Sequence, residues 1–138
     1  MDPNNPVVKL CVEGMQAEAT GKFPEARVLF LQAWDKKRND YEACVAAHYV
    51  ARHQKTPHET LLWNQIALER ASRLEGEEIE AFFPSLYLNL GKSHEDLGNR
   101  QAAMKYYELA ASAASALAQD RYGDTVRDAI TRGLYRVA

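Results

Sequence analysis

The sequence has few of the signals that mark β-strands. It contains no Asn-Gly or Asp-Gly pair at which a tight hairpin turn would form, and its β-branched residues never cluster in alternation with polar ones. This absence excludes a fold built on a sheet, including the parallel sheets that bind dinucleotides. We therefore predict an all-α protein.

Long apolar runs are also absent. No stretch approaches the roughly 18 residues that a membrane-spanning helix needs, and 46% hydrophobic with 26% charged residues is ordinary for a globular protein. The first ten residues, MDPNNPVVKL, lack the basic and then apolar segments that are typical of a secretory signal. We expect a cytoplasmic protein with no membrane partner.

Residues that hold metals are scarce and unsuitably spaced. Neither Cys11 nor Cys44 belongs to a CxxC pair or has a histidine at ligand spacing, so both are expected to be buried thiols in a reducing compartment. His48, His53 and His58 are each five residues apart, so consecutive members turn by about 140° around a helix and do not share a face. We predict no metal site.

The motifs of common enzyme and nucleic-acid-binding classes are missing as well. There is no Gly-rich phosphate loop, GxSxG elbow or HExxH pair, so we expect no enzyme activity, no catalytic residue and no cofactor. The net charge is −2, and the densest basic cluster, Lys36 to Arg38, is three residues long. Such a charge balance argues against a nucleic-acid partner.

The sequence does contain regularly spaced helix-breaking residues and an internal repeat. Glycine and proline predict helix breaks near Gly21, residues 55–57, Gly76 and Gly98, at spacings suited to helical hairpins. Sliding the chain against itself at an offset of 77 aligns two segments that share small and aromatic residues at the same places. The aligned pairs are Gly14 with Gly91, Gly21 with Gly98, Ala26 with Ala103, Phe30 with Tyr107 and Ala33 with Ala110.

On these residues the chain resembles the tetratricopeptide repeat (TPR) family, whose unit is 34 residues long, and in particular its small standalone bacterial-type members. A middle copy is weaker and keeps mainly Ala47 and Ala67. The resemblance implies a single TPR-like domain, an α-solenoid of three helical hairpins with a capping helix at its C-terminal side. The expected boundaries are residues 7–40, 41–74 and 77–117 for the hairpins and 120–137 for the cap.

Two local features refine this expectation. The first helix of the last hairpin is predicted to run from Glu77 to Leu97, with a kink at Pro84 because proline removes a helical hydrogen bond. The capping helix places Val126, Ile130 and other apolar residues on one stripe. Opposite this stripe we expect two ion pairs, Asp124 with Arg127 and Asp128 with Arg132.

The resemblance also implies where a ligand would bind, because the first helix of each TPR hairpin lines a concave groove. The residues that we predict to make the most distinctive peptide contacts are Met15, Tyr49, Arg52, His53, Asn89, Lys92 and Asp96. The other positions assigned to the groove by register are Val8, Cys11, Val12, Glu18, Glu42, Val45, Ala46, Ser85, Leu88 and Glu95. This groove suits a peptide with one anionic and one apolar feature.

The leading hypothesis is thus a non-catalytic scaffold that binds an unknown protein or peptide. A different hypothesis is structural, in which the Ala-rich segment 110–118 mediates a homodimer. A third, RNA binding by a helical repeat, requires a basic stripe, and the acidic residues Glu18, Glu42, Glu95 and Asp96 in the predicted groove argue against it.

Overall fold

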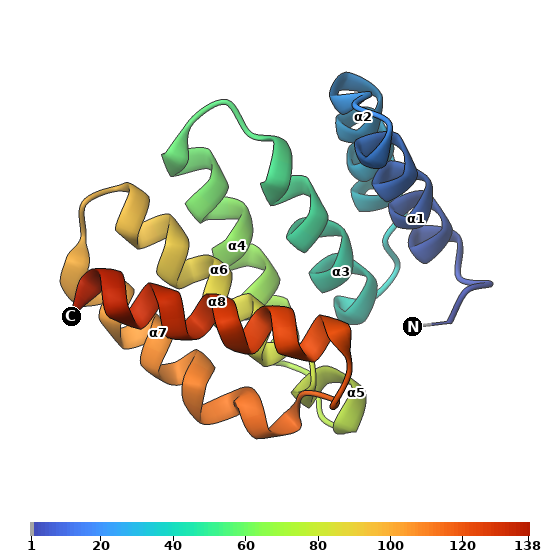
Figure 1. Ribbon diagram of the computed structural model, residues 1–138. Helices are drawn as coiled ribbons and strands as arrows, with labels where there is room; N and C mark the ends of the chain where they lie inside the picture. The colour runs from blue at the N-terminus through green and yellow to red at the C-terminus, as the bar shows by residue number, and fades with distance from the viewer. Residues whose placement is uncertain (1) are drawn as a thin grey trace. The chain divides into compact units, whose positions relative to one another are not determined.

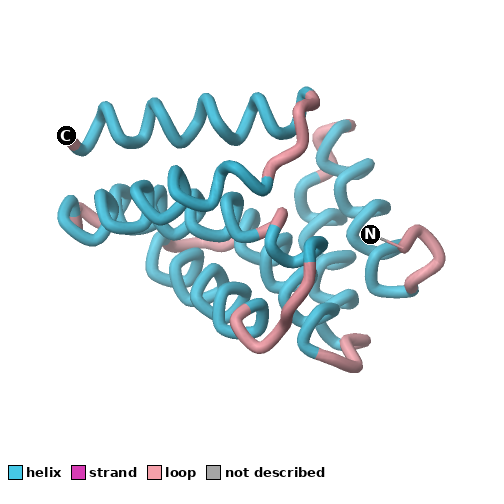
Figure 2. Tube along the Cα trace, turned by 90° about the horizontal axis from the view of Figure 1, so that it is seen from below, coloured by secondary structure: helices cyan, strands magenta, loops and turns pink. Residues whose placement is uncertain are grey.

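The computed structural model describes residues 2–138, and they fold into helices joined by short loops (Figure 1). No strand occurs among these residues, and Figure 2 shows helices and loops alone along the described trace. The all-α prediction is therefore confirmed. In chain order the elements are α1 (Pro6–Ala19), α2 (Phe23–Asp35), α3 (Asp40–Val50), a 3₁₀ turn (Ala51–His53), α4 (Pro57–Ala71), α5 (Glu77–Glu80), α6 (Phe83–Asp96), α7 (Arg100–Ala113), a second 3₁₀ turn (Ala114–Ala116) and α8 (Arg121–Val137).

The chain divides into two compact units, with the boundary between Leu74 and Glu75. Unit 1 contains α1 to α4, and unit 2 contains α5 to α8. Within residues 2–138, no helix combines the length and the apolar character that crossing a membrane requires.

Unit 1 is a helical hairpin with further helices packed on it. α1 and α2 form the hairpin, α3 packs against both of them, and α4 packs against α3. The core between them includes Ala26, Phe30 and Val50, and Trp34 of α2 meets Trp63 of α4 edge to face with ring centroids 5.0 Å apart. The buried residues of unit 1 are mostly alanine and valine, and partly buried aromatic rings pack against them.

Unit 2 repeats the first part of this arrangement. α6 and α7 form the hairpin, and α8 packs against both, as α3 does against α1 and α2 in unit 1. Ala103, Tyr107 and Val137 form one buried cluster, and Ala110 and Ile130 belong to a second. The predicted terminal helix is confirmed, as are its two ion pairs: Asp124 with Arg127 at 2.7 Å and Asp128 with Arg132 at 2.8 Å.

The sequence repeat corresponds to the same close helix contact in both units. A Cβ atom added at Gly14 would lie 2.3 Å from Cε1 of Phe30, and one added at Gly91 would lie 2.7 Å from Cδ1 of Tyr107. Both distances are far inside van der Waals contact, so the two helices of each hairpin approach this closely because glycine is present. In unit 2, Gly133 of α8 lies against the same tyrosine ring. A Cβ atom added at Gly133 would fall 2.5 Å from Cε1 of Tyr107.

The helices begin and end where the sequence predicts breaks, with one exception. Gly21 and Gly98 take positive φ angles of 76° and 79° at the turns of the two hairpins. However, the prediction of one continuous helix from Glu77 to Leu97 is wrong, because α5 ends at Glu80 and α6 begins at Phe83. Pro84 lies in the first turn of α6 and does not kink it, since a backbone N–H at that position would have no partner within the helix.

Candidate functional site

A cluster of polar side chains joins the end of α1 to the turn that follows α3 in unit 1. Nε2 of His53 donates a hydrogen bond to Oε2 of Glu18 over 2.6 Å, and Nη1 of Arg52 lies 3.5 Å from Oε1 of the same carboxylate. The Glu18 and His53 side chains are each 17% exposed, whereas that of Arg52 is 46% exposed. We call Glu18, Arg52 and His53 the Glu18 cluster; it places one cation at the surface beside a shielded carboxylate.

Aromatic rings surround the Glu18 cluster. The His53 ring stacks on Phe30, with centroids 5.8 Å apart, and lies 5.7 Å from the ring of Phe23. Tyr49 also stacks on Phe30, at 5.3 Å, and the guanidinium carbon of Arg52 lies 5.2 Å from the Tyr49 ring centroid. Phe23 is 54% exposed, so the cluster combines a cation with an accessible apolar ring.

Unit 2 contains a corresponding cluster at the end of α6. Glu95 accepts a hydrogen bond from the Tyr107 hydroxyl over 2.7 Å, and it forms a forked pair with Arg136 of α8, with Nε–Oε2 at 2.8 Å and Nη2–Oε1 at 3.0 Å. Arg136 lowers the pKa of Glu95, whereas burial and the Glu95 carboxylate raise the pKa of Tyr107. We call these three residues the Glu95 cluster.

The two clusters occupy equivalent places in the two units. Glu18 and Glu95 are related by the offset of 77 that relates the hairpins, and both reach from the first helix to an arginine on or just after the third. Arg52 and Arg136 are related by an offset of 84 instead. The sequence comparison missed this equivalence because α8 begins 81 residues after the start of α3 instead of 77, and Arg136 lies further from the start of its helix than Arg52 does.

The structure brings together the predicted contact residues of unit 1. Tyr49, Arg52 and His53 lie in one network, and Met15 packs, partly buried, against the core cluster that contains Phe30. The exposed ring of Phe23 completes this set and was missed by the sequence analysis. A signal for it existed, because the offset of 77 aligns Phe23 with a polar residue, arginine, in the other copy.

The predicted contact residues of unit 2 lie on α6. Lys92 and Asp96 form an ion pair one turn apart, with both side chains about half exposed. Asn89, one turn before them, is partly buried. These side chains present a polar, electrically balanced surface on unit 2.

Several of the positions assigned to the groove by register are not exposed, and that part of the prediction is wrong. Leu88 packs against the apolar clusters beneath α8, and Ser85 bonds the Tyr122 hydroxyl of α8. The third helix of each unit covers one side of the first helix, and α3 is itself packed between α1, α2 and α4, so register alone overstates the accessible face. The buried positions are Val8, Cys11, Glu42, Val45, Ala46 and Ser85.

Nothing in the described structure assembles a metal centre, because no group of three or more His, Cys, Asp and Glu side chains within residues 2–138 is placed to hold an ion. Burial raises the pKa of both the Cys11 and Cys44 thiols to about 12, which makes them unreactive as nucleophiles. No protein-family model matches the chain, and no curated protein matches it in sequence.

Proposed function

We propose that the chain is a non-catalytic scaffold that binds a protein or peptide, built as a solenoid of TPR-like hairpins. The observation that carries this proposal is the 46% exposed guanidinium of Arg52, held over the Tyr49 ring beside the exposed ring of Phe23. Arginine and aromatic side chains in such a setting are the residue types that dominate recognition surfaces.

The internal packing supports the repeat architecture in this proposal. The first helix of each hairpin uses one side to hold the third helix, through Glu18 in unit 1 and Glu95 in unit 2. Other positions of the same helices keep solvent exposure: Val12 is 39% exposed, and Lys92 and Asp96 are exposed on α6. A repeat that separates packing positions from accessible ones in this way suits a binding scaffold.

The proposal is tested by selecting binders to the purified chain from a random 12-residue peptide library displayed on phage. We expect enrichment of a family of related peptides, whose synthetic members bind with micromolar or tighter affinity, roughly −8 kcal/mol. Reproducible failure to enrich any peptide family over an empty surface would contradict peptide binding. The variant Lys9→Gln, which changes an exposed residue of α1 outside both clusters, is the control and should select the same family.

The homodimer hypothesis keeps part of its proposed surface, because Ala111, Ser112, Ser115, Ala116 and Ala118 of the Ala-rich segment 110–118 are exposed. Ala110 and Leu117 are buried against Val126 and Ile130 of α8. Under the peptide-binding proposal, we expect light scattering at tens of micromolar protein to give the mass of one chain. A mass of two chains that persists on dilution would favour self-association over peptide binding as the use of this fold.

A further inference from the structure

The arginines of the two equivalent clusters differ in how completely their carboxylate engages them. In unit 2, Arg136 forms a forked pair with Glu95, and its Nη2 also lies 3.3 Å from the Tyr107 hydroxyl. In unit 1, Arg52 approaches Glu18 through one nitrogen at 3.5 Å. A forked arginine–carboxylate pair is short and satisfies two donors at once, whereas a single contact at this length leaves most of the guanidinium fork open.

The residue that follows each arginine also differs. Nε2 of His53 holds Oε2 of Glu18 at 2.6 Å, so the histidine next to Arg52 makes the closer contact to this carboxylate. The offset of 84 that aligns Arg52 with Arg136 places His53 on Val137, whose side chain has no donor. In unit 2 the extra donor to Glu95 is the Tyr107 hydroxyl from the neighbouring helix, which shares Oε1 with Nη2 of Arg136, while Nε of Arg136 contacts Oε2.

We propose that the guanidinium of Arg52, which Glu18 contacts once at 3.5 Å while His53 makes the closer contact, binds an acidic side chain, Asp or Glu, of a peptide docked on unit 1. This inference rests on the proposed peptide-binding function and names the chemistry of its ligand. The Tyr49 ring under Arg52 orients the fork, as aromatic faces commonly do for arginine. A monovalent carboxylate fits better than a phosphate, because the Glu18 carboxylate stays close to the same guanidinium and repels a second charge.

The surface beside Arg52 specifies a second feature of the ligand. Phe23 is 54% exposed and its ring adjoins His53, which also contacts the carboxylate that faces Arg52. An apolar side chain near the acidic residue of the peptide would cover this ring and shield the new ion pair from water. The preferred ligand is thus an acidic residue with an apolar neighbour.

The test repeats the phage selection on the wild-type chain and on the variants Arg52→Gln, Arg136→Gln and His53→Val. We expect wild type to enrich peptides that contain Asp or Glu next to an apolar residue, and Arg136→Gln to enrich the same peptides because its arginine is already paired. Arg52→Gln should lose the acidic preference. His53→Val, which removes the closer donor to Glu18, should weaken it, because the carboxylate can then pair more fully with Arg52.

Affinities of one selected peptide and of its Glu→Gln analogue make the test quantitative. We expect wild type to bind the acidic peptide about tenfold more tightly than its analogue, which is the effect of one charge-assisted hydrogen bond. Arg52→Gln should bind both peptides equally. Enrichment without an acidic preference, or a preference that survives Arg52→Gln, would overturn the inference while peptide binding stands. Absence of any enrichment would overturn peptide binding itself. Circular dichroism and urea unfolding identify a variant that has failed to fold, and for such a variant His53→Phe or Arg52→Met replaces it.

Discussion

Gly91→Ala and Gly133→Ala are each expected to lower the free energy of unfolding by about 2 kcal/mol. The added Cβ would lie 2.7 Å from the Tyr107 ring at Gly91 and 2.5 Å from it at Gly133. Tyr107 is completely buried, so its ring cannot move aside without displacing its neighbours. Overpacking of this kind costs about 3 kcal/mol at the upper end, and the higher helix propensity of alanine returns about 1 kcal/mol.

Urea unfolding of the single and double variants measures this effect. In a Tyr107→Leu background the ring that meets the new methyl group is gone, so Gly91→Ala should cost clearly less than it does in the wild-type chain. An equal cost in the two backgrounds would mean that the alanine acts through something other than the tyrosine. Gly14→Ala provides the matching experiment in unit 1, where Phe30 is the buried ring.

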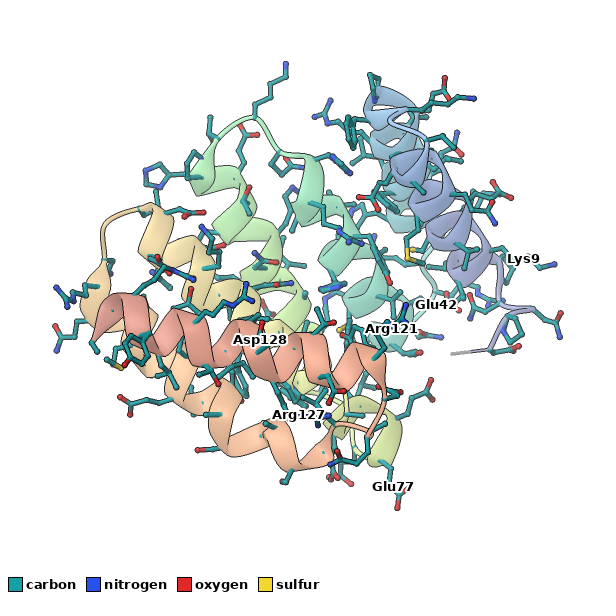
Figure 3. All side chains as sticks on the ribbon, in the orientation of Figure 1. Lys9, Glu42, Glu77, Arg121, Arg127 and Asp128 are labelled. Carbon is teal, nitrogen blue, oxygen red and sulfur yellow. The ribbon has the colours of Figure 1, made fainter. Side chains whose placement is uncertain are left out.

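Glu42→Gln is expected to lower the free energy of unfolding by about 3 kcal/mol near pH 7. The Glu42 side chain is 3% exposed and lies in the first turn of α3, where Figure 3 labels it. Its carboxylate accepts hydrogen bonds from Nδ2 of Asn5 at 2.9 Å, from the Arg38 backbone N–H at 2.9 Å and from the Arg38 guanidinium at 2.8 and 3.2 Å. This carboxylate therefore ties the cap of α1 to the loop before α3.

The pH dependence of this effect has a definite sign. The hydrogen bond from Arg38, followed by that from Asn5, lowers the pKa of Glu42 to about 2, whereas the ordinary value is 4.5. The stabilisation is fully present above the ordinary pKa and is lost as pH falls through the folded-state value. The gap in unfolding free energy between wild type and Glu42→Gln should therefore narrow as pH falls from about 4.5 toward 2.

A surface ion pair supplies the control for Glu42. Asp128 pairs with Arg132 on α8 at 2.8 Å, but both side chains are more than half exposed. Asp128→Asn should change the free energy of unfolding by less than about 0.5 kcal/mol, because water solvates both charges in either state. A comparable loss in the two variants would show that burial of Glu42 contributes nothing beyond an ordinary ion pair.

The repeated hairpins were predictable because the residues that pack against each other in a hairpin lie close together in the sequence and are of characteristic types. A glycine on one helix and a large aromatic ring on the next fit together wherever a hairpin forms, so Gly14 with Phe30 and Gly91 with Tyr107 identify the same contact twice. The break between α5 and α6 was not predicted, because Pro84 is compatible with either a kinked helix or a new first turn. The choice between them depends on how the preceding residues pack.

The candidate site was predictable in part. Register on a repeat correctly marked Tyr49, Arg52 and His53 as neighbours, because residues three and four apart share a helix face. It also marked Glu42 as accessible, although the N-terminal cap of α1 and the loop at Arg38 cover that carboxylate. Such coverage comes from segments distant in sequence, and helical periodicity carries no information about them.

The amino-acid sequence by itself determined the helices, the turns at which glycine ends them and the close contacts within each hairpin. These features depend on residues a few turns apart. The tertiary structure alone decided which charges meet. Glu18 and Glu95 are equivalent in the repeat, yet one is held by His53 and the other by a forked Arg136. Partner choice in these clusters depends on where a third helix crosses the hairpin, and that crossing follows from packing of the whole unit.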